Sequence, residues 1–266
     1  VRYEQDGRRN GRSGSYLNPD ASPATGFAHT EIGLTGLACL AFLGAGHTHS
    51  DGEFKESVKN ALRYLRAVQD NDGAFGGPNA REHESFMYNH AIALTALTEA
   101  YMMTAHNTLR GSAQRGVDFL AMAQNVDPER GHLGWRYGIR PGDSDASVTG
   151  WCALALHTAA KAGLDVPDHV WTGTITVLDD LTGPVRAHLG GAVVSGSEDF
   201  RTGYISRAGF NSRLAGYEDR FVPNRSMDAI NLLVRYFVQG DANRLKRDRV
   251  LLAQARAIAA EPPTAT

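Results

Sequence analysis

Residues able to transfer protons or to bind a polar ligand gather at four points of the chain, each where an apolar stretch begins. Carboxylates and imidazoles act as acids or bases in a dry pocket, and hydroxyl groups orient a ligand. The candidate ligand-binding residues are His29, Glu31, Tyr88, His90, Trp135, Asp143, Asp145, Ser147 and Arg225. No group of Cys and His has the spacing of a metal site, so no metal ligand is assigned. We assign no catalytic residue and no cofactor either.

Capping is the alternative role for most of these side chains. Asp, Ser, Thr and Asn are the usual caps at helix starts, and a single histidine there is commonly held by hydrogen bonds. Trp135 and Trp151 have an equally ordinary alternative in core packing. If the helix starts converge on one face, however, their dipoles favour an anionic or polar ligand there.

The elements that must position these residues form a tandem repeat. Each unit has an apolar first helix, a short loop, a one-faced second helix and a loop rich in glycine and aromatic residues. The expected first helices are 30–46, 86–104, 145–163 and 225–240. The expected second helices are 55–69, 111–124, 168–181 and 244–260. An insertion over 183–209 lengthens the third unit, and its segment 192–194 is the one candidate strand.

The two helices of a unit differ in polarity. First helices such as the one containing Ala153 to Leu156 are apolar nearly all round, which indicates burial on most sides. The first of the second helices instead places Val58, Leu62 and Leu65 on one face and basic residues on the other, so we expect an outer, solvated layer.

Such hairpins bury their apolar faces only by stacking side by side. We therefore predict an all-α fold, an α/α toroid or open horseshoe of about four helical hairpins. The repeat domain covers residues 29–260, after an irregular N-terminal segment 1–28 that ends a preceding repeat, and before a disordered tail 261–266.

A motif in the loops carries a resemblance to a known superfamily. Gln69-x-x-Asp72-Gly73-x-Phe75-Gly76-Gly77 resembles the repeat motif of terpenoid cyclases and protein prenyltransferases, also called the prenyltransferase/squalene oxidase repeat. Gln124 with Gly134-Trp135 looks like a lengthened second copy, and Gly14-Ser15-Tyr16 like the tail of an earlier one. In such a motif we expect the glutamine to bond backbone groups at the helix end and the aromatic ring to pack on the next inner helix.

The resemblance implies a fold but not the family's known reactions. Class II cyclases carry Asp-x-Asp-Asp-Thr at an inner-helix start, whereas the matching stretch here begins at Asp145 and has Ser147 in place of the proton donor. In protein prenyltransferases the same position is a zinc-binding cysteine, and Arg225 stands roughly where the histidine ligand would be. Both mechanisms are disfavoured, as is the thioester chemistry of complement-type domains, which needs Cys-Gly-Glu-Gln.

The function we expect is therefore binding. The concave side of the repeat would accept an apolar ligand, an isoprenoid if the resemblance extends to the ligand, or a segment of a protein partner. The alternative is a divergent enzyme on isoprenoids or carbohydrates, with Glu31, Asp143, Asp145 and the histidines as acid and base groups. A third interpretation is a purely structural piece of a larger repeat protein.

The composition bears on which classes of partner we expect. The net charge is −2 with interspersed signs, which gives no reason to expect nucleic acid. No apolar stretch reaches the roughly 20 residues of a transmembrane helix. Cys39 and Cys152 lie in apolar stretches and are expected to be buried thiols. The segment His47 to Asp51 and the basic run 244–249 are expected to be a solvated loop and a charged helix surface.

Overall fold

Helices make up most of the computed structural model, which describes residues 30–76, 81, 83–184, 200–205, 207, 225–240, 243 and 246–260. The helices are α1 (Glu31–Gly44), α2 (Lys55–Ala67), α4 (Phe86–Thr104), α5 (Asn107–Met122), α6 (Ala146–Lys161), α7 (His169–Leu181), α8 (Ser226–Gln239) and α10 (Arg249–Ala260). Two short antiparallel pairs join β1 (Val126–Asp127) to β2 (Gly131–His132) and β3 (Thr182–Pro184) to β4 (Phe200–Thr202). The all-α prediction is confirmed.

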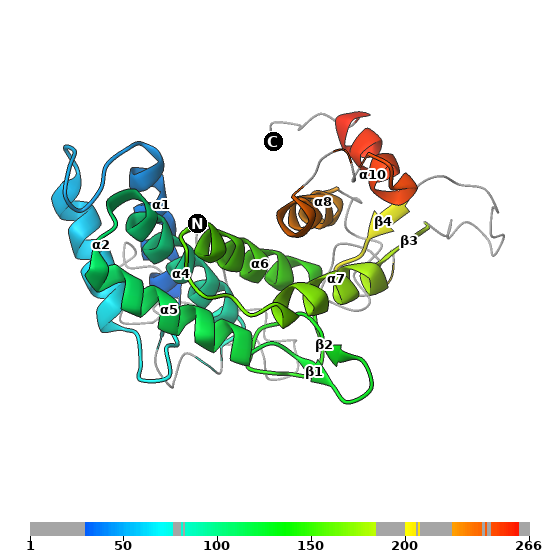
Figure 1. Cartoon of the computed structure of the whole chain (residues 1–266), viewed down its shortest axis with the longest axis horizontal. Coiled ribbons are helices and arrows are strands. Elements are labelled where there is room, and N and C mark those ends of the chain that lie inside the picture. Colours follow the sequence, from blue (N-terminus) through cyan, green and yellow to red (C-terminus); the bar gives the residue numbers. More distant parts are fainter. Residues whose placement is uncertain are drawn as a thin grey trace, which may run out of the picture.

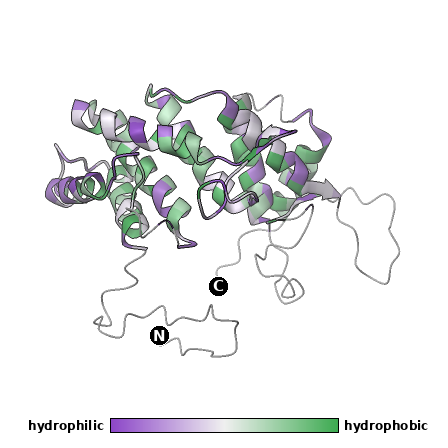
Figure 2. Ribbon diagram, turned by 90° about the horizontal axis from the view of Figure 1, so that it is seen from below, coloured by the Kyte–Doolittle hydropathy of each residue, from purple (hydrophilic) through white to green (hydrophobic). Residues whose placement is uncertain are grey.

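The helices form two layers (Figure 1). The inner helices α1, α4, α6 and α8 contact one another in that order, and each also contacts the outer helix that follows it in the chain, α2, α5, α7 or α10. This is the pairing expected from the alternating polarity of the segments. In the hydropathy-coloured ribbon (Figure 2), hydrophobic and hydrophilic residues alternate along the helices, as expected where each helix has a buried side.

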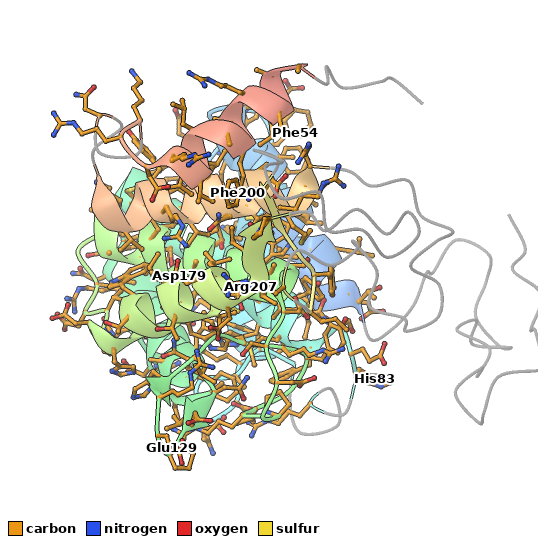
Figure 3. All side chains as sticks on the ribbon, turned by 90° about the vertical axis from the view of Figure 1, so that its right-hand side faces the viewer. Phe54, His83, Glu129, Asp179, Phe200 and Arg207 are labelled. Carbon is orange, nitrogen blue, oxygen red and sulfur yellow. The ribbon has the colours of Figure 1, made fainter. Side chains whose placement is uncertain are left out.

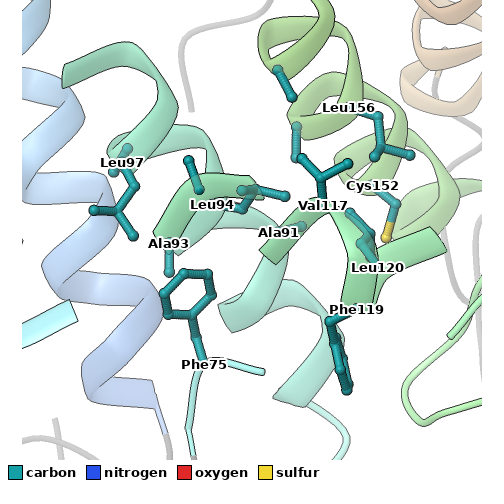
Figure 4. Packing of buried hydrophobic residues seen from close by; sticks show 14 of the residues in the cluster. Phe75, Ala91, Ala93, Leu94, Leu97, Val117, Phe119, Leu120, Cys152 and Leu156 are labelled. Carbon is teal, nitrogen blue, oxygen red and sulfur yellow. The ribbon is translucent and has the colours of Figure 1, made fainter. Parts of the chain in front are cut away.

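Burial follows the same division. The inner helix α4 is buried at nearly every position from Phe86 to Ala100, whereas α2 buries only Val58, Leu62 and Leu65. One continuous apolar cluster extends from α1 to α7, and Figure 4 shows the part around α4, α5 and α6, including Leu94 and Leu156. Cys39 and Cys152 are both buried free thiols, as predicted.

The aromatic rings of the two motif loops are buried as expected, but the glutamines bond other backbone groups than those at the helix end. Gln69 Nε2 donates a hydrogen bond of 3.0 Å to the oxygen of Gly73, in the loop after α2, and Phe75 is fully buried. One hairpin later, Gln124 Nε2 donates a bond of 2.6 Å to the Leu133 oxygen, and Trp135 is fully buried. Each glutamine therefore holds the loop that follows its helix, and each loop inserts a ring into the core.

Two predicted helix starts are wrong by several residues. The outer helix expected from residue 111 begins at Asn107, directly after Ala105 ends α4 with a left-handed backbone at φ 51°. The outer helix expected from residue 244 begins at Arg249, because Asp248 Oδ1 accepts hydrogen bonds from the N–H groups of Val250 (2.9 Å) and Leu251 (3.1 Å) and so caps the first turn.

Several sequence predictions fall outside the described residues. These are His29, the motif tail Gly14-Ser15-Tyr16, the N-terminal segment 1–28, the tail 261–266 and the candidate strand 192–194. Where the insertion is described, it contributes β4, which pairs with β3 and is followed by Tyr204 at the start of α6.

Candidate functional site

Three tyrosines and a serine meet where α4 and α6 begin. Tyr88 donates a hydrogen bond of 2.8 Å to Ser147 Oγ, and its hydroxyl lies 3.1 Å from that of Tyr204. The Tyr204 hydroxyl lies 3.3 Å from that of Tyr137. We call Tyr88, Tyr137, Tyr204 and Ser147 the tyrosine cluster. All four side chains are half-buried, so the cluster reaches the surface at one end of the inner helices.

The local sequence fixes this arrangement. Asp145 has an extended backbone and caps α6, with its Oδ1 accepting the N–H of Val148 at 2.7 Å. The N–H of Ala146 donates to the backbone oxygen of Tyr204 at 2.9 Å. This bond ties the insertion to the α6 start and brings Tyr204 into the cluster.

Beneath the tyrosine cluster lies a buried carboxyl group. The Asp145 side chain is fully buried, and burial raises its pKa to about 6, although the N–H of Val148 and the charge of Arg136 act in the opposite direction. Its Oδ2 has no hydrogen-bond partner within the described part of the chain, and Arg136 Nε lies 3.8 Å away. Burial also raises the pKa of Tyr88 to about 12.

An ion pair lies beside the cluster. Arg136 Nη1 pairs with Asp143, and the guanidinium of Arg136 also stacks 5.1 Å from the ring centre of Tyr137. Asp143 is thus neutralised at the surface. Because Asp145 Oδ2 is enclosed, this carboxyl group holds the helix start rather than facing a ligand.

A stripe of side chains continues from the cluster along α4. Tyr88, Ile92, Thr95, Glu99 and Met102 recur at spacings of three and four residues, so they lie on one side of the helix. Met102 is 46% exposed and Tyr88 and Glu99 are half-buried, whereas Ile92 (7%) and Thr95 (5%) are buried. With a rise of 1.5 Å per residue, the stripe is roughly 21 Å long.

The neighbouring helix α6 carries a matching stripe. Ser147, Trp151, Leu154 and Lys161 are separated by four, three and seven residues, so they lie on one side of α6, and each is partly or fully exposed. The hydrogen bond between Tyr88 and Ser147 places the two stripes side by side at their first residues.

The first and last inner helices, α1 and α8, also have exposed apolar residues. In α1, which packs on α4 through Gly33 and Gly36, Leu34 is 56% and Leu37 42% exposed. In α8, Leu233 is 48% and Tyr236 49% exposed. The other sides of α8 are occupied: Ile230 packs on α6, and Asn231 bonds Gln254 of α10. We call the α4 and α6 stripes, with Leu37 and Leu233, the inner face.

Two of the predicted site residues lie in the core instead. His90 is fully buried, with Nδ1 accepting the N–H of Phe75 at 3.2 Å and Nε2 lying 3.0 Å from the Gly116 oxygen. Burial lowers its pKa to about 4, so the ring is neutral at pH 7. Trp135 is likewise enclosed and donates its ring N–H to the Leu120 oxygen at 2.8 Å. Both rings hold the repeat together.

The remaining predicted residues make other contacts. Glu31 is exposed and accepts a hydrogen bond of 3.5 Å from Tyr64 of α2. Arg225 pairs with Asp228 at 3.1 Å in the first turn of α8. The structure thus brings Tyr88, Asp143, Asp145 and Ser147 together, whereas Glu31 contacts Tyr64 and Arg225 contacts Asp228.

Tyr204 and Arg136 were missed by the sequence analysis. Tyr204 comes from the insertion, which has no counterpart in the other repeats, and no local pattern indicates which helix it approaches. Arg136 directly follows the motif tryptophan. It lies in the same loop as Asp143, and this nearness in sequence was the available indication of their ion pair.

The fold and site define a tandem array of helical hairpins whose inner helices α1, α4 and α8 each carry exposed apolar side chains among the described residues. No family model, curated protein or solved structure matches the chain. Across the described residues, no helix has the length and apolar character needed to cross a bilayer. The same residues contain no group of three or more His, Cys, Asp or Glu side chains placed to hold a metal ion.

Proposed function

We propose that the chain is a binding module whose inner face takes an elongated apolar ligand with one polar end. The observation that carries this proposal is the exposure of large apolar side chains on the inner helices, including Leu37, Met102 and Leu233. Exposed apolar side chains gathered on one face mark a ligand or partner site, and methionines adapt to irregular apolar shapes.

The tyrosine cluster supports the position of the polar end. Its hydroxyl groups lie at the first residues of both stripes, where they can donate to or accept from a hydroxyl or carbonyl group. Along α4 the stripe extends roughly 21 Å, past buried Ile92 and Thr95 and half-buried Glu99, to the exposed apolar side chain of Met102. A chain of isoprenoid length fits these dimensions.

We further propose that the hairpins belong to an α/α toroid of the terpenoid cyclase and protein prenyltransferase superfamily. The support is the recurrence of one loop structure, with Gln69 and Phe75 repeated as Gln124 and Trp135. An isoprenoid ligand follows from this resemblance alone, whereas an apolar ligand follows from the inner face.

A hydrophobic segment of a protein partner is the second candidate. The observation in its favour is that exposed apolar residues extend beyond the stripes to Leu34 of α1 and Tyr236 of α8. A polypeptide segment covers such a broad surface more readily than a single small molecule.

Extraction of the purified chain with organic solvent, followed by mass spectrometry, tests the small-molecule proposal. We expect a lipid or isoprenoid in an amount comparable to that of the protein. Its loss in a Met102→Asn, Leu233→Asn double variant that still folds would locate it on the inner face. Material of similar amount in that variant would contradict this location, and the absence of any lipid would favour the partner segment.

A further inference from the structure

A second candidate site lies in the outer layer, away from the inner face. A cavity of about 190 Å³ opens between α2 and the start of α5. Its lining includes Lys59, Arg63 and Arg66 of α2 together with His49 and His106. No carboxylate belongs to the lining that the described residues form. The cavity is therefore a concentrated patch of cationic and imidazole groups.

Among the lining residues, His49 is the one whose buried polar atoms lack a hydrogen-bond partner in the described part of the chain. Both of its ring nitrogens are enclosed, and neither has a hydrogen-bond partner among the described residues. The ring of His106 lies edge-on to it, with centroids 5.1 Å apart. Thr48 fixes the loop that carries His49, because its Oγ1 accepts the N–H groups of Ser50 (3.2 Å) and Asp51 (3.0 Å). The predicted solvated loop thus directs one histidine into a cavity.

The positive charges around His49 are only weakly compensated. Lys59 lies 3.5 Å from Glu56 in the same helix, but both side chains are about half exposed or more, so this pair is weak. Arg63 donates to the neutral side chain of Asn60 at 3.1 Å.

The start of α5 adds to this potential. The helix has 16 residues and no side chain caps its N-terminus, while Thr108 Oγ1 is 2.9 Å from His106 Nδ1. The free N–H groups at such a start favour an anion.

We propose that this cavity binds a phosphate group. Arginines bind phosphate through paired N–H groups, a lysine supplies a point charge, and an imidazole nitrogen donates a further hydrogen bond. The cavity is small, so the group it holds is inorganic phosphate or the terminal phosphate of a monoester whose remaining atoms lie in solvent.

Binding is coupled to His49 protonation. Burial and the charges of His106 and Lys59 lower the pKa of His49 in the free protein. Phosphate would offset these charges and the cost of burial, so its binding raises this pKa. The phosphate also gains a proton near its second pKa, about 6 for a monoester, so its negative charge decreases as His49 becomes charged. The upward shift of the His49 pKa, rather than a rise in affinity at acid pH, therefore reports the coupling. Arg63, Arg66 and the start of α5 keep their positive potential over this range.

Calorimetry and NMR of the full chain test the proposal, with inorganic phosphate and glycerol 3-phosphate as probes and chloride added to hold ionic strength constant. We expect saturable binding and an upward shift of the His49 ring pKa. An Arg63→Gln, Arg66→Gln double variant should bind at least tenfold more weakly, whereas an Arg256→Gln, Arg247→Gln double variant, with the same charge change near α10, should bind normally.

The two probes separate the sources of the phosphate. Equal or tighter binding of glycerol 3-phosphate indicates a phosphomonoester, and binding of inorganic phosphate alone indicates the free ion. Lack of saturation, an unchanged His49 pKa, or equal losses in the two double variants would overturn the proposal. Thermal unfolding of each variant verifies that it folds, and His49→Gln supplies an independent test if the arginine variant does not.

Discussion

The Gln69 side chain donates a hydrogen bond of 2.9 Å to the backbone oxygen of Ser112, which joins the end of one outer helix to the next. The same relationship recurs one hairpin later, where Gln124 Nε2 donates to the Val170 oxygen at 3.1 Å. The motif glutamine therefore joins successive hairpins, and it also bonds the loop that follows its own helix. Neighbouring hairpins depend on one another through these bonds.

Replacing Gln124 by alanine is expected to destabilise the chain by about 2 kcal/mol, because the Leu133 oxygen loses its side-chain donor and the Val170 oxygen, which also accepts from Thr174 Oγ1, loses one of its donors. Urea unfolding measures this loss. The matched control is Gln114→Ala, whose bond to the Asp165 oxygen lies at the surface, and it should cost less than about 1 kcal/mol. Equal losses at the two glutamines would contradict the structural role of the motif.

Two helical glycines should respond in opposite ways to alanine. At Gly173 a Cβ atom would lie 2.4 Å from the Leu133 oxygen and 2.6 Å from Gln124 Nε2, so Gly173→Ala should be strongly destabilising. At Gly111 only Arg115 Nη1 lies within 4 Å, at 3.9 Å, so Gly111→Ala should stabilise α5 by about 1 kcal/mol. Thermal melting tests both, and a stabilised Gly173 variant would refute the close approach of the loop to α7.

Asp145 should make stability depend on pH. Its folded pKa of about 6 is above its ordinary value of 3.8, so the folded chain binds this proton more tightly than the unfolded chain. The contribution of Asp145 to stability is therefore greatest at acid pH and falls as the pH rises through 3.8 to 6, by about 3 kcal/mol.

Asp145→Asn keeps an oxygen that can cap α6 but does not titrate. The free energy of unfolding of the unmodified chain minus that of the variant should fall by about 3 kcal/mol between pH 3 and pH 7. Urea titrations at these two pH values give this difference. A difference that stays constant would show that Asp145 titrates normally.

The Tyr88–Ser147 hydrogen bond should couple α4 to α6. Tyr88→Phe and Ser147→Ala are each expected to cost about 1 kcal/mol, and the double variant should cost less than their sum. Chemical unfolding of the four proteins gives the coupling energy. Strict additivity would mean that the two hydroxyl groups do not interact in solution.

The sequence predicts the helices better than it predicts the site. Alternating polarity identified the inner and outer helices. A helix buried on nearly all sides, such as α4, has apolar residues all round, whereas a helix buried on one side, such as α2, has apolar residues on one face only. Site geometry depends instead on contacts between distant residues. His90 and Trp135 resemble ligand-binding residues by type, but their ring nitrogens satisfy backbone oxygens inside the core.

Residues outside the repeat were hardest to predict. Tyr204 lies 116 residues from Tyr88 in the chain, and its approach depends on the pairing of β3 with β4 and on the Ala146 hydrogen bond. The outer cavity was missed for a related reason, because His49, Arg63 and His106 come together only when α2 and α5 pack. Only the three-dimensional arrangement reveals the tyrosine cluster and the outer cavity. A further cavity, of about 260 Å³, lies where the β3–β4 pair meets α10; its lining includes Asp179, Phe200 and Arg207, which are labelled in Figure 3.

The central claim is that the inner face binds an apolar chain, and titration with farnesol, a neutral isoprenoid alcohol, tests it most directly. Trp151 on the inner face reports binding by fluorescence, with Trp151→Phe to verify the source of the signal. We predict saturable binding that a Met102→Asn, Leu233→Asn double variant weakens roughly tenfold or more, while Met122→Asn on outer helix α5, where the side chain is 41% exposed, leaves it unchanged. Equal binding by all three proteins, or no saturable binding, would contradict the account.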